Sequence, residues 1–319
     1  MSNVGLKWTD LGVIASGGVG GGAYLGNGIA ILGSFSYQNI YRSIDYGATW
    51  SDLGVVLTVS DDSTNTMAYL DGGIVIVGSF LRHIYRSTNY GLNWIDLGTI
   101  VGGSSPQNIA YLGNGIVIEC SGTTHIWRST DYGANWTDLG VIAGAGIYAT
   151  ASLGNGIAVI GCNGGYVYRS TDYGATWTTL GVIASDEILV MAYLGNGVVI
   201  GGDLSGHVCR STDYGANWTD LGVISSGKIY AIAPLGGGIA ILGGVGGHVY
   251  RTIDYGATWT DLGIIASTIY VMSSLGSGIA ILGDSGGHVY RSSVVAHRHH
   301  PTIPTEPNRG KELSRMGSL

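Results

Sequence analysis

A cassette of about 41 residues recurs along this chain, and its most regular part is the octet Ser-Thr-Asp-Tyr-Gly-Ala-Asn-Trp, intact at 129–136 and 211–218. Six copies, aligned on this octet, end in tryptophans that stand 41 to 44 residues apart: Trp50, Trp94, Trp136, Trp177, Trp218 and Trp259. A period of this length is typical of the blades of a β-propeller. The repeat therefore limits the possible folds before any chemistry is considered.

The two ends of the chain carry complementary halves of one cassette. Trp8 stands one period before Trp50, whereas the last cassette stops after Arg291-Ser292 and has no Trp of its own. We therefore predict an all-β fold over residues 1–293: a seven-bladed β-propeller of four-stranded blades. The ring is closed by a strand at 6–14 that pairs with the last blade, which leaves no open sheet edge.

The order of residues within a cassette supports four strands per blade. Short runs rich in Ile, Val and Tyr are bounded by Gly and Asn, as strands joined by tight turns are. Seven turns of the Leu-Gly-x-Gly type indicate seven blades. The 57 glycines and 20 tyrosines fit one large all-β domain with many short turns, and nothing indicates a second globular domain.

The octet resembles the Asp-box (BNR) repeat, Ser-x-Asp-x-Gly-x-Thr-Trp, of sialidase-like propellers, sortilin-type receptors and photosystem II assembly factors. In such a turn the acidic residue accepts backbone N–H bonds, Gly takes a positive φ and Trp buries its ring beside the blade. We expect this structural role for Asp45, Asn89, Asp131, Asp172, Asp213 and Asp254, for the six tryptophans above and for Trp8.

The resemblance also suggests the hypothesis of a glycoside hydrolase. Sialidases hold the substrate carboxylate with three arginines at the central rim and use a Tyr nucleophile with a Glu partner and an Asp acid. Here the propeller has only Arg82 outside the repeat position, and only Glu119 and Glu187. The remaining carboxylate candidates are Asp186, Glu187, Asp203 and Asp284. We assign no catalytic residue, and a hydrolase stays an alternative.

Seven arginines recur at one position of the cassette and so are spread around the ring. They are Arg42, Arg86, Arg128, Arg169, Arg210, Arg251 and Arg291. Each is expected to bind a local carboxylate or carbonyl. An attractive partner is the Asp of the Trp strand, which recurs as Asp10, Asp52, Asp96, Asp138, Asp220 and Asp261, with Thr179 in blade 4.

Charge and composition limit the kinds of partner that we expect. The net charge is −7 and the propeller has two lysines, Lys7 and Lys228, so we expect no nucleic-acid partner. No apolar run approaches the roughly 20 residues that span a bilayer, so we expect no membrane insertion. The three cysteines, Cys120, Cys162 and Cys209, follow no pattern of a disulfide or metal site, and no cofactor is expected.

The last residues break from the repeat. Residues 294–319 carry three of the five prolines and the cluster His297-Arg298-His299-His300. By composition this is a linker-like tail, for which we predict a contact with a partner or with another copy. No apolar signal segment is visible at the N-terminus, and the compartment is undetermined, with an extracellular, virion or cell-surface location preferred.

Comparison of the blades with one another separates two faces. The Leu-Gly-x-Gly turns and the Asp boxes are uniform and share one face, and variation gathers on the opposite face. There the third strand of each blade begins with a hydrogen-bonding side chain, and these form our candidate ligand-binding residues: Asn39, His83, His125, Tyr166, His207, His248 and His288. The alternative is that each His only caps its turn and packs on the aromatic residue two positions later.

These features favour a non-catalytic recognition propeller that binds glycans or a cell surface, as a multivalent lectin or adhesin does. Tyr, Trp, Asn, Ser, Thr and His are abundant and charge is sparse, which suits neutral sugars. Linked weak sites gain roughly 10²–10⁴ in avidity. The competing hypothesis is a structural or docking propeller within a larger assembly, such as a virion, a surface filament or an assembly complex.

Overall fold

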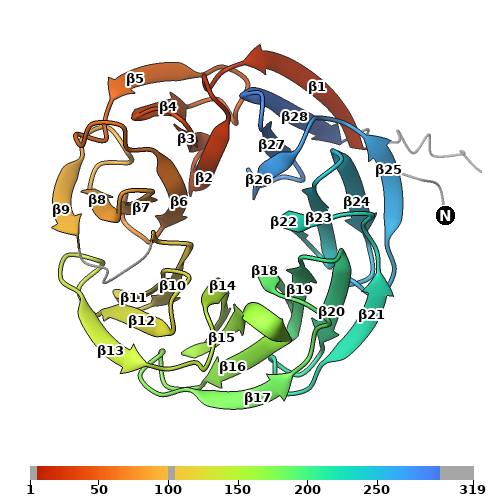
Figure 1. The fold of residues 1–319 in the computed structure, drawn as a ribbon. Helices are drawn as coiled ribbons and strands as arrows, with labels where there is room; N and C mark the ends of the chain where they lie inside the picture. The colour runs from red at the N-terminus through yellow and green to blue at the C-terminus, as the bar shows by residue number, and fades with distance from the viewer. Residues whose placement is uncertain (1–5, 100–104, 295–319) are drawn as a thin grey trace, which may run out of the picture.

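The computed structural model describes residues 6–99 and 105–294. Seven four-stranded antiparallel sheets surround a central axis, and their innermost strands line the centre of the ring (Figure 1). The predicted seven-bladed β-propeller is confirmed. The predicted tail, with its cluster at His297–His300, lies outside the described residues.

From the centre outward, blades 1 to 3 contain the following strands. Blade 1 has β2 (Val19–Gly26), β3 (Ile29–Ser34), β4 (Asn39–Ser43) and β5 (Ser51–Val55). Blade 2 has β6 (Thr64–Tyr69), β7 (Val75–Ser79), β8 (His83–Ser87) and β9 (Ile95–Thr99). Blade 3 has β10 (Asn108–Gly113), β11 (Ile116–Cys120), β12 (His125–Ser129) and β13 (Thr137–Val141).

Blades 4 to 6 repeat this order. Blade 4 has β14 (Ile147–Gly154), β15 (Ile157–Cys162), the short 3-10 helix η1 (Asn163–Gly165), β16 (Tyr166–Ser170) and β17 (Thr178–Val182). Blade 5 has β18 (Ile188–Gly195), β19 (Val198–Asp203), β20 (His207–Ser211) and β21 (Thr219–Val223). Blade 6 has β22 (Ile229–Gly236), β23 (Ile239–Gly244), β24 (His248–Thr252) and β25 (Thr260–Ile264).

Blade 7 is built from both ends of the chain. It contains β26 (Ile269–Ser274), β27 (Ala280–Asp284), β28 (His288–Val294) and, as its outer strand, β1 (Leu6–Val13). The register places Trp8 opposite Ser292 and Val13 opposite His288. The predicted closure of the ring by the N-terminal strand is therefore confirmed.

The hydrophobic core consists of seven clusters, each lying between two consecutive blades. In the cluster between blades 3 and 4, for example, Ile118 and Ile126 meet Ile147 and Ile160. Trp177, from the Asp-box end of blade 4, packs against this cluster, and the other six tryptophans of the repeat occupy the equivalent place in theirs. Each Trp thus joins its blade to the preceding one.

The Asp box works as the sequence predicts. In blade 3 the Oγ atom of Ser129 donates to Asp131 at 2.8 Å, and the backbone N–H of Asn135 donates to the same carboxylate at 2.9 Å. Tyr132 and Gly133 both have left-handed φ values, 57° and 75°. A Cβ on Gly133 would lie 2.7 Å from Ile76 of blade 2, so this glycine also permits the close approach of two blades.

The arginines of the repeat contact a different partner from the carboxylate we predicted. The Nε atom of Arg128 donates to the carbonyl oxygen of Tyr173, in the Asp box of the next blade, at 2.8 Å. The same bond occurs for Arg42, Arg86, Arg169, Arg210 and Arg291. The predicted pairing with the outer-strand Asp is wrong, because that Asp binds the first residue of its own blade's third strand, a histidine in five blades and Asn39 in blade 1. The other kind of partner that we expected, a carbonyl, is the one observed.

The loops divide between the two faces as predicted. The turn before the third strand bonds to the loop that enters the blade, as when Leu204 donates its N–H to Glu187 at 2.9 Å. On the other face the Asp box bonds to the turn between the first two strands, as when Tyr132 donates its N–H to Gly115 at 2.8 Å. The first of these, the variable face, is the one on which the predicted ligand-binding residues lie.

Candidate recognition sites on the variable face

The five predicted histidines each bind a carboxylate of the neighbouring outer strand. The Nδ1–carboxylate distance is 2.9 Å for His83–Asp96, His125–Asp138 and His248–Asp261, 3.0 Å for His288–Asp10 and 3.1 Å for His207–Asp220. In four of the pairs the two residues are 13 positions apart in sequence. That spacing is visible in the sequence, but the strand register is needed to show that the two side chains meet.

A bulge in the outer strand holds each carboxylate in place. The register shifts between His125 and Trp127, and the N–H of Gly140 donates to Asp138 at 2.8 Å. Gly140 has a φ of 78°, which the Leu-Gly step of the repeat supplies. The same Gly–Asp bond recurs at Asp10, Asp52, Asp96, Asp220 and Asp261.

The pairs lie where two blades meet. Residues two positions apart on a strand share a face, and Tyr85, two positions after His83, is buried against Leu25 and Ile31 of blade 1. Thr58, in the loop between blades 1 and 2, donates to Asp96 at 3.3 Å. Each His–Asp pair therefore lies toward the preceding blade, beside the loop that connects the two.

Both members of each pair remain partly accessible. The histidine side chains are 22–37% exposed and the aspartates 26–44% exposed. The residue opposite the first position of the third strand is aliphatic in six blades and 58–70% exposed: Val13, Val55, Val141, Val182, Val223 and Ile264. In blade 2 it is Thr99, opposite His83. An imidazole, a carboxylate and an exposed aliphatic side chain therefore occur together in blades 3, 5, 6 and 7.

Two blades depart from this pattern in different ways. In blade 1 Asn39 replaces the histidine and still donates to Asp52 at 2.9 Å. In blade 4 both members differ, since Tyr166 and Thr179 stand at the two positions. Blade 4 has lost the histidine and the aspartate together, as expected if the two side chains work as a unit.

Two of the carboxylates, Asp138 and Asp10, have pKa values below the ordinary value of an aspartate. Partial burial is the largest single influence on the Asp138 pKa and acts upward, but the hydrogen bonds from His125 and Gly140 together lower that pKa. The pKa of Asp10 is lowered in the same way by Gly12 and His288 against its burial. An ionised carboxylate accepts the Nδ1 hydrogen and leaves Nε2 of a neutral imidazole as an acceptor.

The carboxylates considered for hydrolysis have other partners. Asp203 and Asp284 are 1% and 2% exposed. Each accepts the N–H of the histidine four positions later and the hydroxyl of a serine in the preceding loop, Ser185 or Ser267. These hydrogen bonds stabilise the turns that precede the third strands of blades 5 and 7. Asp186 accepts a bond from Ser205 at 2.7 Å, and burial raises the pKa of Glu187.

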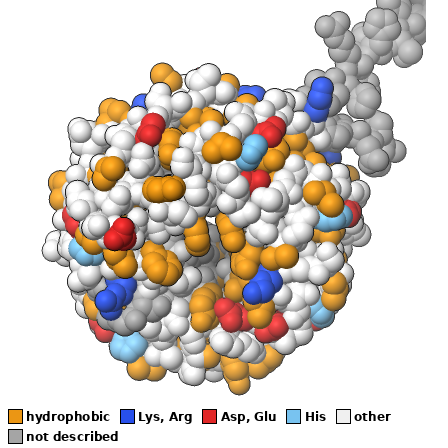
Figure 2. All heavy atoms as spheres, turned by 45° about the horizontal axis from the view of Figure 1, so that its top comes forward, with side chains coloured by type: hydrophobic (Ala, Val, Ile, Leu, Met, Phe, Trp, Pro, Cys, Tyr) orange, Lys and Arg blue, Asp and Glu red, His pale blue; other side chains and the backbone are white. Residues whose placement is uncertain are grey.

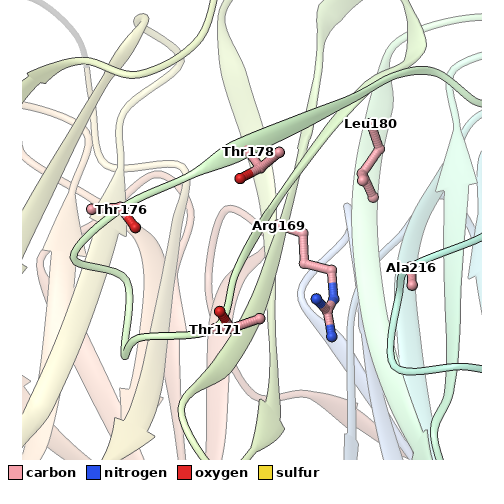
Figure 3. Close-up of a pocket in the computed structure, with 6 residues that line it drawn as sticks. All are labelled: Arg169, Thr171, Thr176, Thr178, Leu180 and Ala216. Atoms are coloured by element: carbon pink, nitrogen blue, oxygen red, sulfur yellow. The ribbon is translucent and has the colours of Figure 1, made fainter.

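Two hollows accompany these sites. A cavity of about 320 Å³ occupies the centre of the ring and is lined by the innermost strands; Figure 2 shows a hollow there bordered by hydrophobic side chains, with histidines toward the periphery. A second hollow of about 230 Å³ lies between blades 4 and 5 and is lined by Arg169 on one side and Ala216 on the other (Figure 3). In the described ranges, no three His, Cys, Asp or Glu side chains form a metal-binding group.

Comparison with known proteins supports the repeat and the fold. The BNR-Asp box repeat family matches residues 126–139. Similar solved structures include YCF48 bound to D1 peptide, with 20% identity, 91% of this chain and 97% of that chain covered and a TM-score of 0.74. Virginiamycin B lyase from Staphylococcus aureus is 14% identical, with 91% and 100% covered and a TM-score of 0.78.

The WD40 β-propeller domain of Doa1 is a third similar structure, at 15% identity, with 91% and 97% covered and a TM-score of 0.74. At these identities the likeness concerns the fold alone. The sequence matches no curated protein. Over the residues that the structure describes, no helix is long and apolar enough to cross a membrane.

Proposed function

We propose that this propeller is a non-catalytic, multivalent recognition protein that binds glycans on a surface through its repeated His–Asp sites. The observation that carries the proposal is the repetition, in five blades, of a partly exposed histidine held on a carboxylate beside the outer strand. A surface ion pair contributes only about 0–1 kcal/mol to folding, so stability alone is a weak reason to repeat it five times.

The chemistry of the site suits a neutral sugar. Nδ1 donates to the carboxylate, and no hydrogen bond within the described residues involves Nε2, which is left to accept from a hydroxyl group. The carboxylate retains lone pairs for a second hydroxyl. In four of the five sites an exposed Val or Ile opposite the histidine offers an apolar contact for the C–H face of a sugar ring.

The spacing of the sites around one ring suits a repetitive target. Each site is small and partly open, so a single contact is weak. When several equivalent sites engage one surface, later contacts form at a high effective concentration, and avidity exceeds the single-site affinity by roughly 10²–10⁴. Binding should therefore depend steeply on the density of immobilised glycan.

The test compares the native chain with a variant in which all five histidines become asparagine. Asn39 already makes the carboxylate bond in blade 1, so His→Asn keeps that bond and removes the imidazole acceptor. We expect saturable binding of the native chain to a dense glycan array, and a loss of at least tenfold in the variant at unchanged thermal stability. Absence of binding to every glycan, or equal binding by the variant, would overturn the proposal.

A docking propeller is the second candidate function, favoured by the asymmetric lining of the central cavity. Its first three blades present Gly20, Asn65 and Gln107 where blades 6 and 7 present Tyr230 and Tyr270. A single asymmetric site suits one partner segment rather than a repeated ligand. One of the similar propellers, YCF48, is described as bound to a peptide.

A further inference from the structure

The mouth of the central cavity on the variable face carries a row of three aromatic rings. The rings of Phe35 and Tyr270 are stacked, with centroids 5.5 Å apart and planes 6° apart, and Tyr230 follows at 5.4 Å from Tyr270. Phe35 is 42% exposed and the two tyrosines are half-buried. Phe35 lies over Gly20, which presents no side chain of its own to the mouth.

Carboxamides occupy the other side of the same mouth. Asn65 donates its Nδ2 hydrogen to Pro106 at 2.6 Å, Gln107 donates to Ser105 at 3.2 Å, and Asn108 accepts from Thr150 at 3.1 Å. These bonds fix the three amides. They leave Asn65 Oδ1, Gln107 Oε1 and Asn108 Nδ2 without a hydrogen-bond partner among the described residues, on side chains that line the cavity.

An aromatic row facing fixed amides suits an extended peptide that bears prolines. Proline-rich segments adopt an extended helix with three residues per turn and dock on aromatic-lined grooves, because little conformational entropy remains to be lost. Carboxamide groups match the donors and acceptors of a peptide backbone. The cavity volume of about 320 Å³ is at the small end of ligand pockets, so only a short stretch can enter.

This chain contains such a segment. Pro301, Pro304 and Pro307 stand three residues apart in the sequence Pro-Thr-Ile-Pro-Thr-Glu-Pro, so in an extended three-residue helix they share one edge. These residues lie outside the described part of the chain. We propose that the aromatic mouth of one copy binds residues 301–307 of a second copy.

The direction of the chain favours another copy over the same one. β28 runs from His288, at the variable face, toward the opposite face and is described as far as Val294. Pro301 is seven Cα–Cα steps from Val294, a reach of at most about 25 Å. A return over the length of the strands and across the blade to the mouth is on the order of 35 Å, by the rise and spacing of β-strands. This difference favours the mouth of another copy.

A contact of this kind joins unlike surfaces and does not close on itself. Heterologous head-to-tail interfaces form open chains unless the rotation closes a ring. The native protein should therefore associate into larger oligomers as its concentration rises. Since the mouth is distinct from the outer His–Asp sites, this inference stands or fails independently of glycan binding.

The test is sedimentation velocity of the full chain from 1 to 200 µM, beside titration of a synthetic peptide of residues 298–309. We expect concentration-dependent association that is lost in Tyr270→Ala and in a Pro301→Ala/Pro304→Ala/Pro307→Ala variant. The peptide should bind the native propeller at least tenfold more tightly than it binds Tyr270→Ala. Phe80→Ala removes an exposed aromatic ring elsewhere on the same face and is the matched control.

Three outcomes would overturn the inference. In the first, the native chain stays monomeric and the peptide does not bind. In the second, association persists without the prolines. In the third, a soluble oligosaccharide, and not the peptide, binds the mouth in a Tyr270-dependent manner, which would assign it to a sugar.

Discussion

Arg42 of blade 1 donates its Nε hydrogen to the carbonyl oxygen of Tyr90 in blade 2, at 3.0 Å. Tyr90 belongs to the Asp box and has a left-handed φ of 57°. The box of one blade therefore presents a backbone acceptor to the arginine of the blade before it. Hydrophobic clusters and this bond act at the same boundaries, so each blade depends on its neighbours.

Removal of one such arginine should weaken the ring. Arg128→Met deletes the 2.8 Å bond to Tyr173, and we expect the free energy of unfolding to fall by about 1.5–3 kcal/mol, as for a hydrogen bond from a charged group. Urea titration followed by Trp fluorescence measures it. Arg82→Met is the control, because no hydrogen bond of the Arg82 side chain occurs among the described residues; equal losses in both variants would show that the blade-to-blade bond is unimportant.

Blade 2 offers a stabilising change. Asn89 accepts a hydrogen bond from the backbone N–H of Asn93 at 2.9 Å. In blade 3, Asp131 accepts bonds from both the backbone N–H and the side-chain amide of Asn135, at 2.9 and 2.7 Å. Asn89→Asp should add the second bond and raise the free energy of unfolding by about 0.5–1.5 kcal/mol at pH 7. Asn89→Ala, which removes the Oδ1 acceptor of Ser87 and Asn93, should lower it, and a neutral result for Asn89→Asp contradicts the prediction.

The Asp boxes should also set the acid limit of stability. Burial raises the pKa of Asp45, but the bonds from Thr49, Ser43 and Ala48 lower it from 3.8 to about 2. A carboxyl whose pKa is lower in the folded state stabilises the fold above its unfolded pKa, and this contribution is lost as the pH falls toward the folded value. Unfolding should therefore become easier between pH 4 and pH 2. Asn89→Asp should lose its advantage over the native chain in that range.

The buried carboxyl of Glu119 should give the opposite dependence of stability on pH. Its carboxyl is buried on β11 without a hydrogen-bond partner in the described part of the chain, and burial raises its pKa well above 4.5. A raised folded pKa means stability that is present in acid and is lost as the pH rises through the folded value. Leu32, Leu242 and Leu282 occupy this position in three other blades.

Glu119→Leu should therefore raise the free energy of unfolding by about 1–4 kcal/mol at neutral pH. The gain should be larger at pH 8 than at pH 5, and denaturant titrations at the two values measure it. Glu187→Gln, at a half-buried glutamate whose pKa burial also raises, should give a smaller gain with the same pH dependence. A gain that is the same at both pH values would mean that Glu119 does not titrate as proposed.

The tryptophans allow a matched comparison of one hydrogen bond. Trp136 donates its Nε1 hydrogen to Gly133 at 3.0 Å, whereas Nε1 of Trp8 is buried without a partner among the described residues. Both Trp→Phe changes remove similar ring area, so Trp136→Phe should cost about 1 kcal/mol more than Trp8→Phe. Differential scanning calorimetry of the two variants tests this order, and equal or reversed costs would refute it.

The fold was largely predictable from the sequence because the repeat is long and regular. Seven Leu-Gly-x-Gly turns predicted the number of blades, the position of Trp8 one period before Trp50 predicted the closure, and the Asp boxes predicted the turns. Side-chain partners were harder to predict. Arg128 and His125 both compete for nearby acceptors, and only the strand bulge at Gly140 places Asp138 beside His125 and leaves Arg128 facing the next blade.

The candidate sites were predictable in part. The sequence located the seven positions at the start of the third strands, but their carboxylate partners depend on cross-strand register. The central mouth was missed altogether, since Phe35, Tyr230 and Tyr270 come from blades 1, 6 and 7. No local pattern links residues that only the closed ring brings together, and whether these residues bind a ligand stays a prediction.

The pairing of β1 with β28 has a consequence for synthesis. Asp10 meets His288 only after 278 further residues have been added, which at 5–20 residues per second takes about 14–56 seconds. During that interval the ring is open and β1 has no strand to pair with. The exposed edges of the incomplete ring can then pair with strands of a neighbouring nascent chain. Translation rate and local chain density should thus decide how much of this protein reaches the closed ring rather than an exchanged or aggregated form.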